Sequence, residues 1–150
     1  TGAQVGRPVD QNSEMVIVDS LTGNDVTMTE RFNGKAVLMV YFATWCGACA
    51  QELPELQRQL NELGNPNAAV LGIAMEGDTA EQIAVFRENH GIEFDIWIDN
   101  AGNDRKLIDS GVEAFPTEFV IDREHIVVFN DPNAYAGEAF EALSKAAAKQ

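Results

Sequence analysis

The sequence predicts an α/β domain with a mixed central sheet flanked by helices. The continuously apolar run Ala36–Phe42 has the composition of a central strand that is buried on both faces, as in a parallel sheet. Segments of strand and helix character then alternate, and the chain closes with two strands and a helix. A chain of 150 residues with 45% hydrophobic and 23% charged residues fits one ordinary globular domain.

The first half of the chain is expected to form a β-hairpin, the central strand and a long helix. Strands over Met15–Val18 and Val26–Met28 flank a turn signal at Thr22–Asp25. After the central strand, leucines recur at intervals of three and four and give a helix over residues 47–63 one apolar face. Gly64 then ends this helix.

The second half continues the alternation without a linker or repeat. Asp78 or Thr79 is expected to cap a helix that ends near His90-Gly91. The strands are expected over residues 68–74, 94–98, 117–121 and 126–129, and the further helices over 104–110 and 134–148. We expect a flexible N-terminal segment over residues 1–13 and a single domain over residues 14–150.

Charge and composition exclude several classes of function. The formal net charge is −14 and the ten lysines and arginines are scattered, which argues against binding of nucleic acid or of an anionic membrane surface. No apolar run is long enough to span a bilayer. The whole supply of cysteine and histidine is Cys46, Cys49, His90 and His125, and its spacing does not suit a structural zinc site. We expect no metal.

The pair Cys46 and Cys49 carries the chemistry that the sequence predicts. A buried strand ends just before the cysteines and a helix begins at them, so Cys46 lies at a helix N-terminus that favours the thiolate. The thiolate is the nucleophile of disulfide exchange. Cys46 at the exposed end can attack a disulfide, and Cys49 one turn further can resolve the mixed disulfide. Metal sites use the same spacing, but the strand, the helix and the adjacent Trp45 together favour a redox pair that needs no other cofactor.

A second signal is Phe115–Thr117, directly before a predicted strand. A proline is tolerated at the start of a strand because no ladder donor is needed there. By itself Pro116 fits an ordinary trans proline in that position.

These motifs resemble those of the thioredoxin superfamily, and in particular its extracytoplasmic TlpA/ResA type. Residues 45–54 follow the pattern W-C-x-x-C-x-x-E-x-P of that group. The match extends to Gly34-Lys35, to Phe115–Thr117 and to Ile121-Asp122, and in looser form from about residue 14 to the end.

The resemblance implies a thioredoxin fold with an N-terminal β-hairpin and a central α/β insertion near residues 79–98. It also implies that Pro116 is cis and lies against Cys46. The backbone of Phe115 would then pair with an extended substrate segment, with Trp45 and Thr117 beside it.

Two glutamates near the cysteines are left open. Cytosolic thioredoxins carry a buried Asp where this chain has Val40, whereas the TlpA/ResA type has a Glu at the position of Glu52. Glu52 lies one helical turn beyond Cys49 and either modulates its deprotonation or is a surface residue of an acidic helix. Glu118 can point toward the site or away from it, because strand alternation does not decide its face.

The resemblance implies an oxidoreductase that reduces disulfides of extracytoplasmic proteins, with apocytochrome c as a candidate substrate. It implies protein thiols and disulfides as partners, an upstream membrane electron donor, a monomer, and a periplasmic location with an anchor in a removed N-terminal segment. An oxidase or isomerase would use the same chemistry in another direction.

Two other classes share this fold. A copper chaperone would use the two thiolates with His125 as a third ligand, but its family has three residues between the cysteines. A peroxiredoxin needs prolines around its reactive cysteine, and Thr44–Cys46 lacks them.

Overall fold

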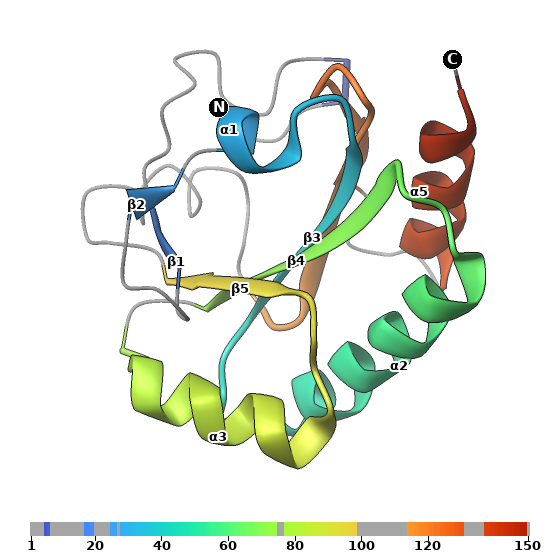
Figure 1. The fold of residues 1–150 in the computed structure, drawn as a ribbon. Coiled ribbons are helices and arrows are strands. Elements are labelled where there is room, and N and C mark those ends of the chain that lie inside the picture. The colour runs from blue at the N-terminus through green and yellow to red at the C-terminus, as the bar shows by residue number, and fades with distance from the viewer. Residues whose placement is uncertain are drawn as a thin grey trace.

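The computed structural model describes residues 5–6, 17–19, 25–26, 28–74, 77–98, 114–130 and 137–149. These residues form one sheet of seven strands in the order β2-β1-β5-β4-β3-β6-β7 (Figure 1). The strands are β1 (Ile17–Asp19), β2 (Asp25–Val26), β3 (Ala36–Phe42), β4 (Ala68–Ala74), β5 (Asp95–Ile98), β6 (Thr117–Ile121) and β7 (Val127–Phe129). The helices are α1 (Met28–Phe32), α2 (Gly47–Leu63), α3 (Ala80–His90) and α5 (Glu138–Ala148).

The sheet is mixed, as predicted. Strands β3, β4 and β5 are parallel to one another, whereas β6 is antiparallel to β3 and β1 is antiparallel to β5. The predicted N-terminal hairpin is present as the antiparallel pair β1 and β2. All seven residues of β3 are buried, which explains why its sequence is continuously apolar.

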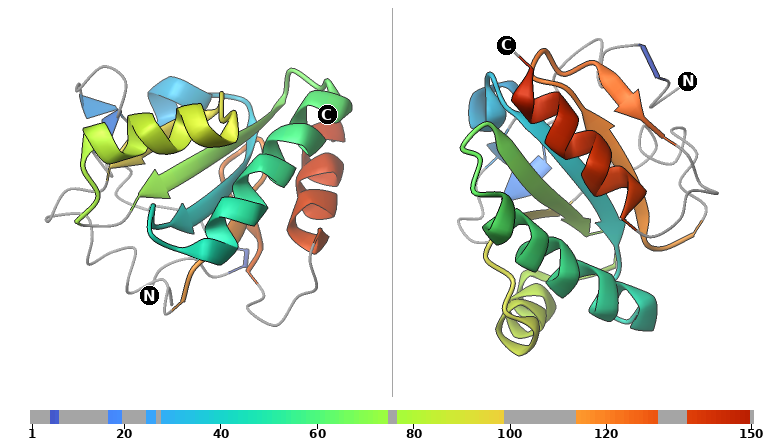
Figure 2. Two further views of the ribbon diagram at one scale, coloured as in Figure 1. Left: turned by 90° about the horizontal axis from the view of Figure 1, so that it is seen from below. Right: turned by 90° about the vertical axis from the view of Figure 1, so that its right-hand side faces the viewer.

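Helices cover both faces of the sheet. On one face, α2, α3 and α5 contribute Leu53, Ile83 and Leu143 to a common core. On the other face, α1 contributes Met28 and Phe32 to a second core. Figure 2 shows α2 and α5 side by side across the same face of the strands. Cys49, which lies on α2, belongs to the core on this face.

Two predicted boundaries are wrong by more than one residue. Met28 begins helix α1 rather than ending a strand, and it shares its core with Phe32 one helical turn later. A strand with its alternating faces would also have buried Glu30, which is exposed as part of the helix. The last helix begins at Glu138 rather than at Ala134, because Gly137 precedes it with a left-handed φ of 93°.

Other predicted segments agree with the structure or lie outside it. The helix over residues 47–63 has the predicted bounds, and Thr79 rather than Asp78 caps α3. The predicted helix over residues 104–110 lies outside the described residues, as does most of the predicted flexible segment 1–13. Each helix that the structure describes is too short or too polar to cross a membrane.

The topology brings three chain segments to one edge of the sheet. Phe42 pairs with Ala74, so the parallel strands β3 and β4 end side by side. The antiparallel strand β6 begins at the same edge, since Thr117 pairs with Tyr41. The cysteines after β3, Asp78 after β4 and Pro116 before β6 therefore meet.

Candidate active site

Cys46 is the N-cap of α2 and is partly exposed. Its backbone is extended, with φ −87° and ψ 116°, and its Sγ accepts a hydrogen bond from the backbone N–H of Cys49 at 3.2 Å. This N–H and the helix dipole stabilise negative charge on the sulfur. Both cysteines are free thiols in the structure, and Cys49 is fully buried.

The buried Cys49 has the opposite electrostatic environment. Burial, together with the hydrogen bond to Cys46, raises the pKa of its thiol to about 12. It belongs to a core of apolar side chains, among them Val40 and Leu53, which cannot stabilise a charge. Cys49 therefore stays protonated at neutral pH, and Cys46 is the sulfur that a substrate can reach.

The segment before β6 lies against Cys46. The peptide bond between Phe115 and Pro116 is cis, which confirms what the resemblance implies. The Cys46 thiol donates a weak hydrogen bond to the carbonyl oxygen of Phe115 at 3.7 Å. The Phe115 ring also meets the ring of Trp45 edge to face, with centroids 6.0 Å apart, and Trp45 is 76% exposed. Thr117 turns its hydroxyl to the carbonyl of Ala114.

A buried carboxylate fixes the loop in front of the cysteines. Asp78 accepts hydrogen bonds from the backbone N–H of Thr44 at 2.9 Å and from its hydroxyl at 2.7 Å. Sequence reasoning considered Asp78 only as a helix cap. The signal that could have revealed this contact is that Thr44 and Asp78 each follow one of two adjacent parallel strands.

Glu118 points to the helix side of the sheet. Phe119 and Ile121 belong to the core under α1, whereas Val120 belongs to the core under α2, so alternation places Glu118 on the face covered by α2. It lies opposite Val40 on β3. The register between β3 and β6 supplies the information that the sequence lacked.

Glu52 and Glu118 are hydrogen-bonded through their carboxyl groups. Burial, together with the hydrogen bond to Glu52 and the negative charge of Glu52, raises the pKa of Glu118 to about 9. Both side chains are partly buried, so Glu52 is not fully exposed to solvent. Glu118 therefore holds its proton at neutral pH.

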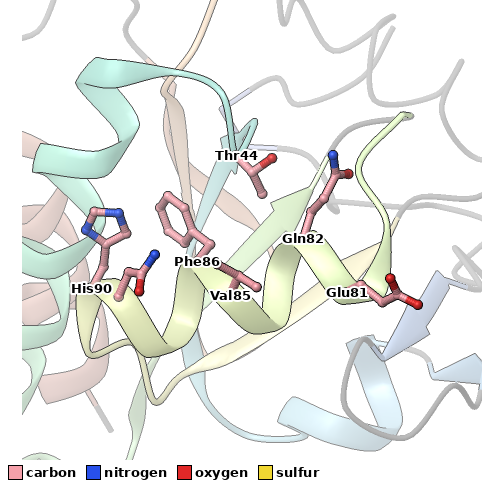
Figure 3. A pocket seen from close by; sticks show the side chains of 7 residues that line it. Thr44, Glu81, Gln82, Val85, Phe86 and His90 are labelled. Carbon is pink, nitrogen blue, oxygen red and sulfur yellow. The ribbon is translucent and has the colours of Figure 1, made fainter.

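A pocket of about 460 Å³ lies between the loop before Cys46 and helix α3 (Figure 3). Its lining residues are Thr44, Glu81, Gln82, Val85, Phe86, Asn89 and His90. His90 stands in the last turn of α3 with its ring centroid 4.5 Å from that of Phe86, so it packs as well as ending the helix. Thr44 is the lining residue next in sequence to Trp45, and the pocket thus adjoins the exposed side of the site.

His125 lies away from the cysteines. It follows β6, whereas Pro116 precedes it, and its Nε2 is 2.9 Å from the carbonyl oxygen of Phe32. Within the described part of the chain, no group of three or more His, Cys, Asp or Glu side chains is placed to hold a metal ion. The third ligand that a copper chaperone would require is thus not supplied by His125.

Comparisons with known proteins agree with this geometry. Residues 10–130 match the model of the AhpC/TSA family. The chain is 26% identical to thioredoxin-like protein YneN of Bacillus subtilis over 83% of this chain and 71% of that protein. It is 33% identical to thiol-disulfide oxidoreductase ResA of Bacillus anthracis, over 75% of this chain. The match spans 62% of the length of ResA, so this chain covers less than two thirds of that relative.

A solved structure extends the comparison to the fold. A thiol:disulfide interchange protein from Chlorobium tepidum TLS superposes with a TM-score of 0.75 at 22% identity, over 98% of this chain and 99% of that one. At this identity the likeness concerns the fold. The family match shows that the chain belongs to the AhpC/TSA family, and the likeness to ResA and to this structure supports a TlpA/ResA-like member of the thioredoxin superfamily.

Proposed function

We propose that this protein reduces disulfides of other proteins by dithiol–disulfide exchange through Cys46 and Cys49. The observation that carries the proposal is the asymmetry of the two thiols. The Cys46 sulfur is accessible at a helix N-terminus against cis-Pro116, and the protonated thiol of Cys49 is buried one turn behind it.

The reaction follows from this arrangement in two displacements. The Cys46 thiolate attacks a substrate disulfide, forms a mixed disulfide, and releases the first substrate sulfur as a thiolate. Cys49 loses its proton and attacks the Cys46 sulfur, which forms the Cys46–Cys49 disulfide and releases the second substrate sulfur. The protein dithiol gives up two electrons and the substrate disulfide takes them.

The substrate segment is proposed to pair with the backbone at Phe115. In the free enzyme the Phe115 carbonyl accepts the hydrogen bond of the Cys46 thiol. Once Cys46 is part of a mixed disulfide it has no proton to donate, so this carbonyl becomes available to an N–H of the substrate. Trp45, whose exposed ring leans on Phe115, and Thr117 at the start of β6 would border that segment.

Glu52 is proposed to govern the protonation of Cys49. The thiol must lose its proton to resolve the mixed disulfide, although burial opposes the charge. Glu52 lies one helical turn beyond Cys49 on α2, at the spacing at which helical side chains are neighbours.

The setting is proposed from the resemblance to the TlpA/ResA type. In this proposal the protein is extracytoplasmic and membrane-anchored, receives electrons from a membrane donor, and has apocytochrome c among its substrates. Its redox cofactor would be the Cys46–Cys49 disulfide itself, and it would act as a monomer.

The test is reduction of insulin by dithiothreitol, with and without the protein. We expect acceleration by the wild type, none by Cys46→Ser, and a stable mixed disulfide with Cys49→Ser, because resolution then fails. Wild-type protein that leaves insulin unchanged would overturn the proposal. Parallel assays of hydrogen peroxide consumption and of Cu(I) binding would identify a peroxiredoxin or a copper chaperone instead.

A further inference from the structure

We propose that Glu118 is the proton store of this site: with Glu52 it forms a carboxyl pair that hands one proton to Cys49 when the Cys46–Cys49 disulfide is opened. This inference rests on the proposed exchange chemistry. It gives a role to a side chain that the two displacements above do not use.

The placement of Glu118 is the first argument. It lies on β6 directly opposite Val40, on the face of the sheet that α2 covers. This chain therefore has an apolar residue on β3 and a carboxyl group on the neighbouring strand, aimed at the same side of the sheet.

The partner of Glu118 is the second argument. Its carboxyl group is hydrogen-bonded to that of Glu52, and two carboxyl groups in contact can make this bond only if one of them is protonated. Glu52 in turn follows Cys49 by one helical turn. Glu52 thus connects strand β6 with the helical turn that carries Cys49.

The surrounding charges favour retention of that proton. Strand β3 presents the uncharged Val40, and the register of β7 with β6 involves Val120 and Ile121 rather than Glu118. Helix α5, which also packs on β6, carries Glu138, Glu141 and Lys145. Among the described residues, the charge that acts on Glu118 is that of Glu52, and it raises the pKa.

The proton transfer balances as follows. A reducing thiolate attacks the Cys46 sulfur, the Cys46–Cys49 bond breaks, and Cys49 leaves with the electron pair as a buried thiolate. Glu118 passes its proton to the Glu52 carboxylate, Glu52 passes it on to the Cys49 thiolate, and the pair regains a proton from solvent. The transfer is favourable because burial raises the pKa of both groups and the thiol starts from the higher ordinary value, 9.0 against 4.5. In the reverse direction the Glu52 carboxylate accepts the proton of Cys49.

The experiment opens the oxidised Cys46–Cys49 disulfide with a water-soluble phosphine, which attacks sulfur without first losing a proton. Aliquots are quenched with an alkylating reagent, and the opened protein is quantified by mass. We expect the wild-type rate to fall about tenfold between about pH 8 and about pH 10, as the pair loses its proton, within the range that general acid catalysis supplies.

Glu118→Gln should be about tenfold slower than the wild type near pH 8 and should show no fall through pH 9. Glu118→Asp keeps a titrating carboxyl group and should retain the fall. Glu124→Gln, in the exposed turn after β6, is the matched control and should follow the wild type. Thermal unfolding of each variant establishes that it is folded.

A Glu118→Gln variant that is folded and keeps the wild-type pH profile would overturn the inference. Failure of the exchange chemistry is separate, because it would appear as wild-type protein that does not reduce insulin. The phosphine measurement reports proton delivery whichever protein substrate is used.

Discussion

Removing the hydroxyl of Thr44 should destabilise the protein and slow its reaction together. Asp78 is 9% exposed and accepts two hydrogen bonds from Thr44, one from the hydroxyl at 2.7 Å and one from the backbone at 2.9 Å. Thr44→Val keeps the volume and the backbone donor but leaves one carboxylate oxygen without this partner. A hydrogen bond to a charged group is worth about 1.5–3 kcal/mol, so we expect a loss of about that size.

The measurement is urea unfolding followed by circular dichroism, with the insulin assay on the same preparations. Thr44→Val should lower the free energy of unfolding by about 1.5–3 kcal/mol at an unchanged m-value. Thr44→Ser keeps the hydroxyl and is the matched control. Since Thr44 lies two residues before Cys46, the Val variant should also reduce insulin several-fold more slowly at temperatures where it is fully folded.

The reasoning would be refuted if Thr44→Val were as stable as Thr44→Ser. A stability loss with unchanged insulin reduction would show that the contact with Asp78 stabilises the fold without positioning Cys46.

Three further predictions follow from the structure. In Gly72→Ala the new Cβ would lie 3.1 Å from Cγ1 of Ile96 and 3.2 Å from Cε1 of Phe42. Urea unfolding should therefore show a free energy of unfolding that is lower by about 1–3 kcal/mol. Unchanged stability would mean that the neighbouring side chains move aside without a loss of stability. Mass spectrometry after iodoacetamide treatment near pH 8 should find Cys46 alkylated and Cys49 intact, because the pKa of Cys49 is about 12; equal labelling would contradict its burial. The pKa of Glu118 is raised from 4.5 to about 9, so between pH 4.5 and about pH 9 folded Glu118 holds a proton that the unfolded chain has lost. The free energy of unfolding should therefore fall as the pH rises through this window. Urea titrations of Glu118→Gln should show a smaller fall. An identical pH dependence in the variant and the wild type would show that Glu118 ionises normally.

The elements with strong periodicity could be predicted from the sequence. The leucine spacing that ends at Gly64 gave the bounds of α2, and the apolar run gave β3, because both patterns report burial directly. The position of Cys46 at the helix N-terminus followed from those two boundaries. The cis bond at Pro116 came from the resemblance and not from the residues.

The parts that failed depend on pairing between distant segments. Helix α1 was missed because five residues are too few to show a helical period. The face of Glu118 follows from its register with Val40, and the contact of Asp78 with Thr44 from the parallel pairing of β3 and β4. A local sequence pattern does not show which strands are neighbours in the sheet. The polar contacts near the cysteines could therefore be identified only from the structure.

The central claim is that Cys46 and Cys49 form a reversible redox pair that acts as a reductant. The most direct measurement equilibrates the protein in glutathione buffers of graded ratio, traps the thiols by alkylation, and counts the modified cysteines by mass. We predict a single two-electron transition between dithiol and intramolecular disulfide, with a potential near or below that of thioredoxin, about −270 mV. A potential near about −120 mV would mean that the protein oxidises its substrates. If no intramolecular disulfide formed at any ratio, the redox pair itself would be contradicted.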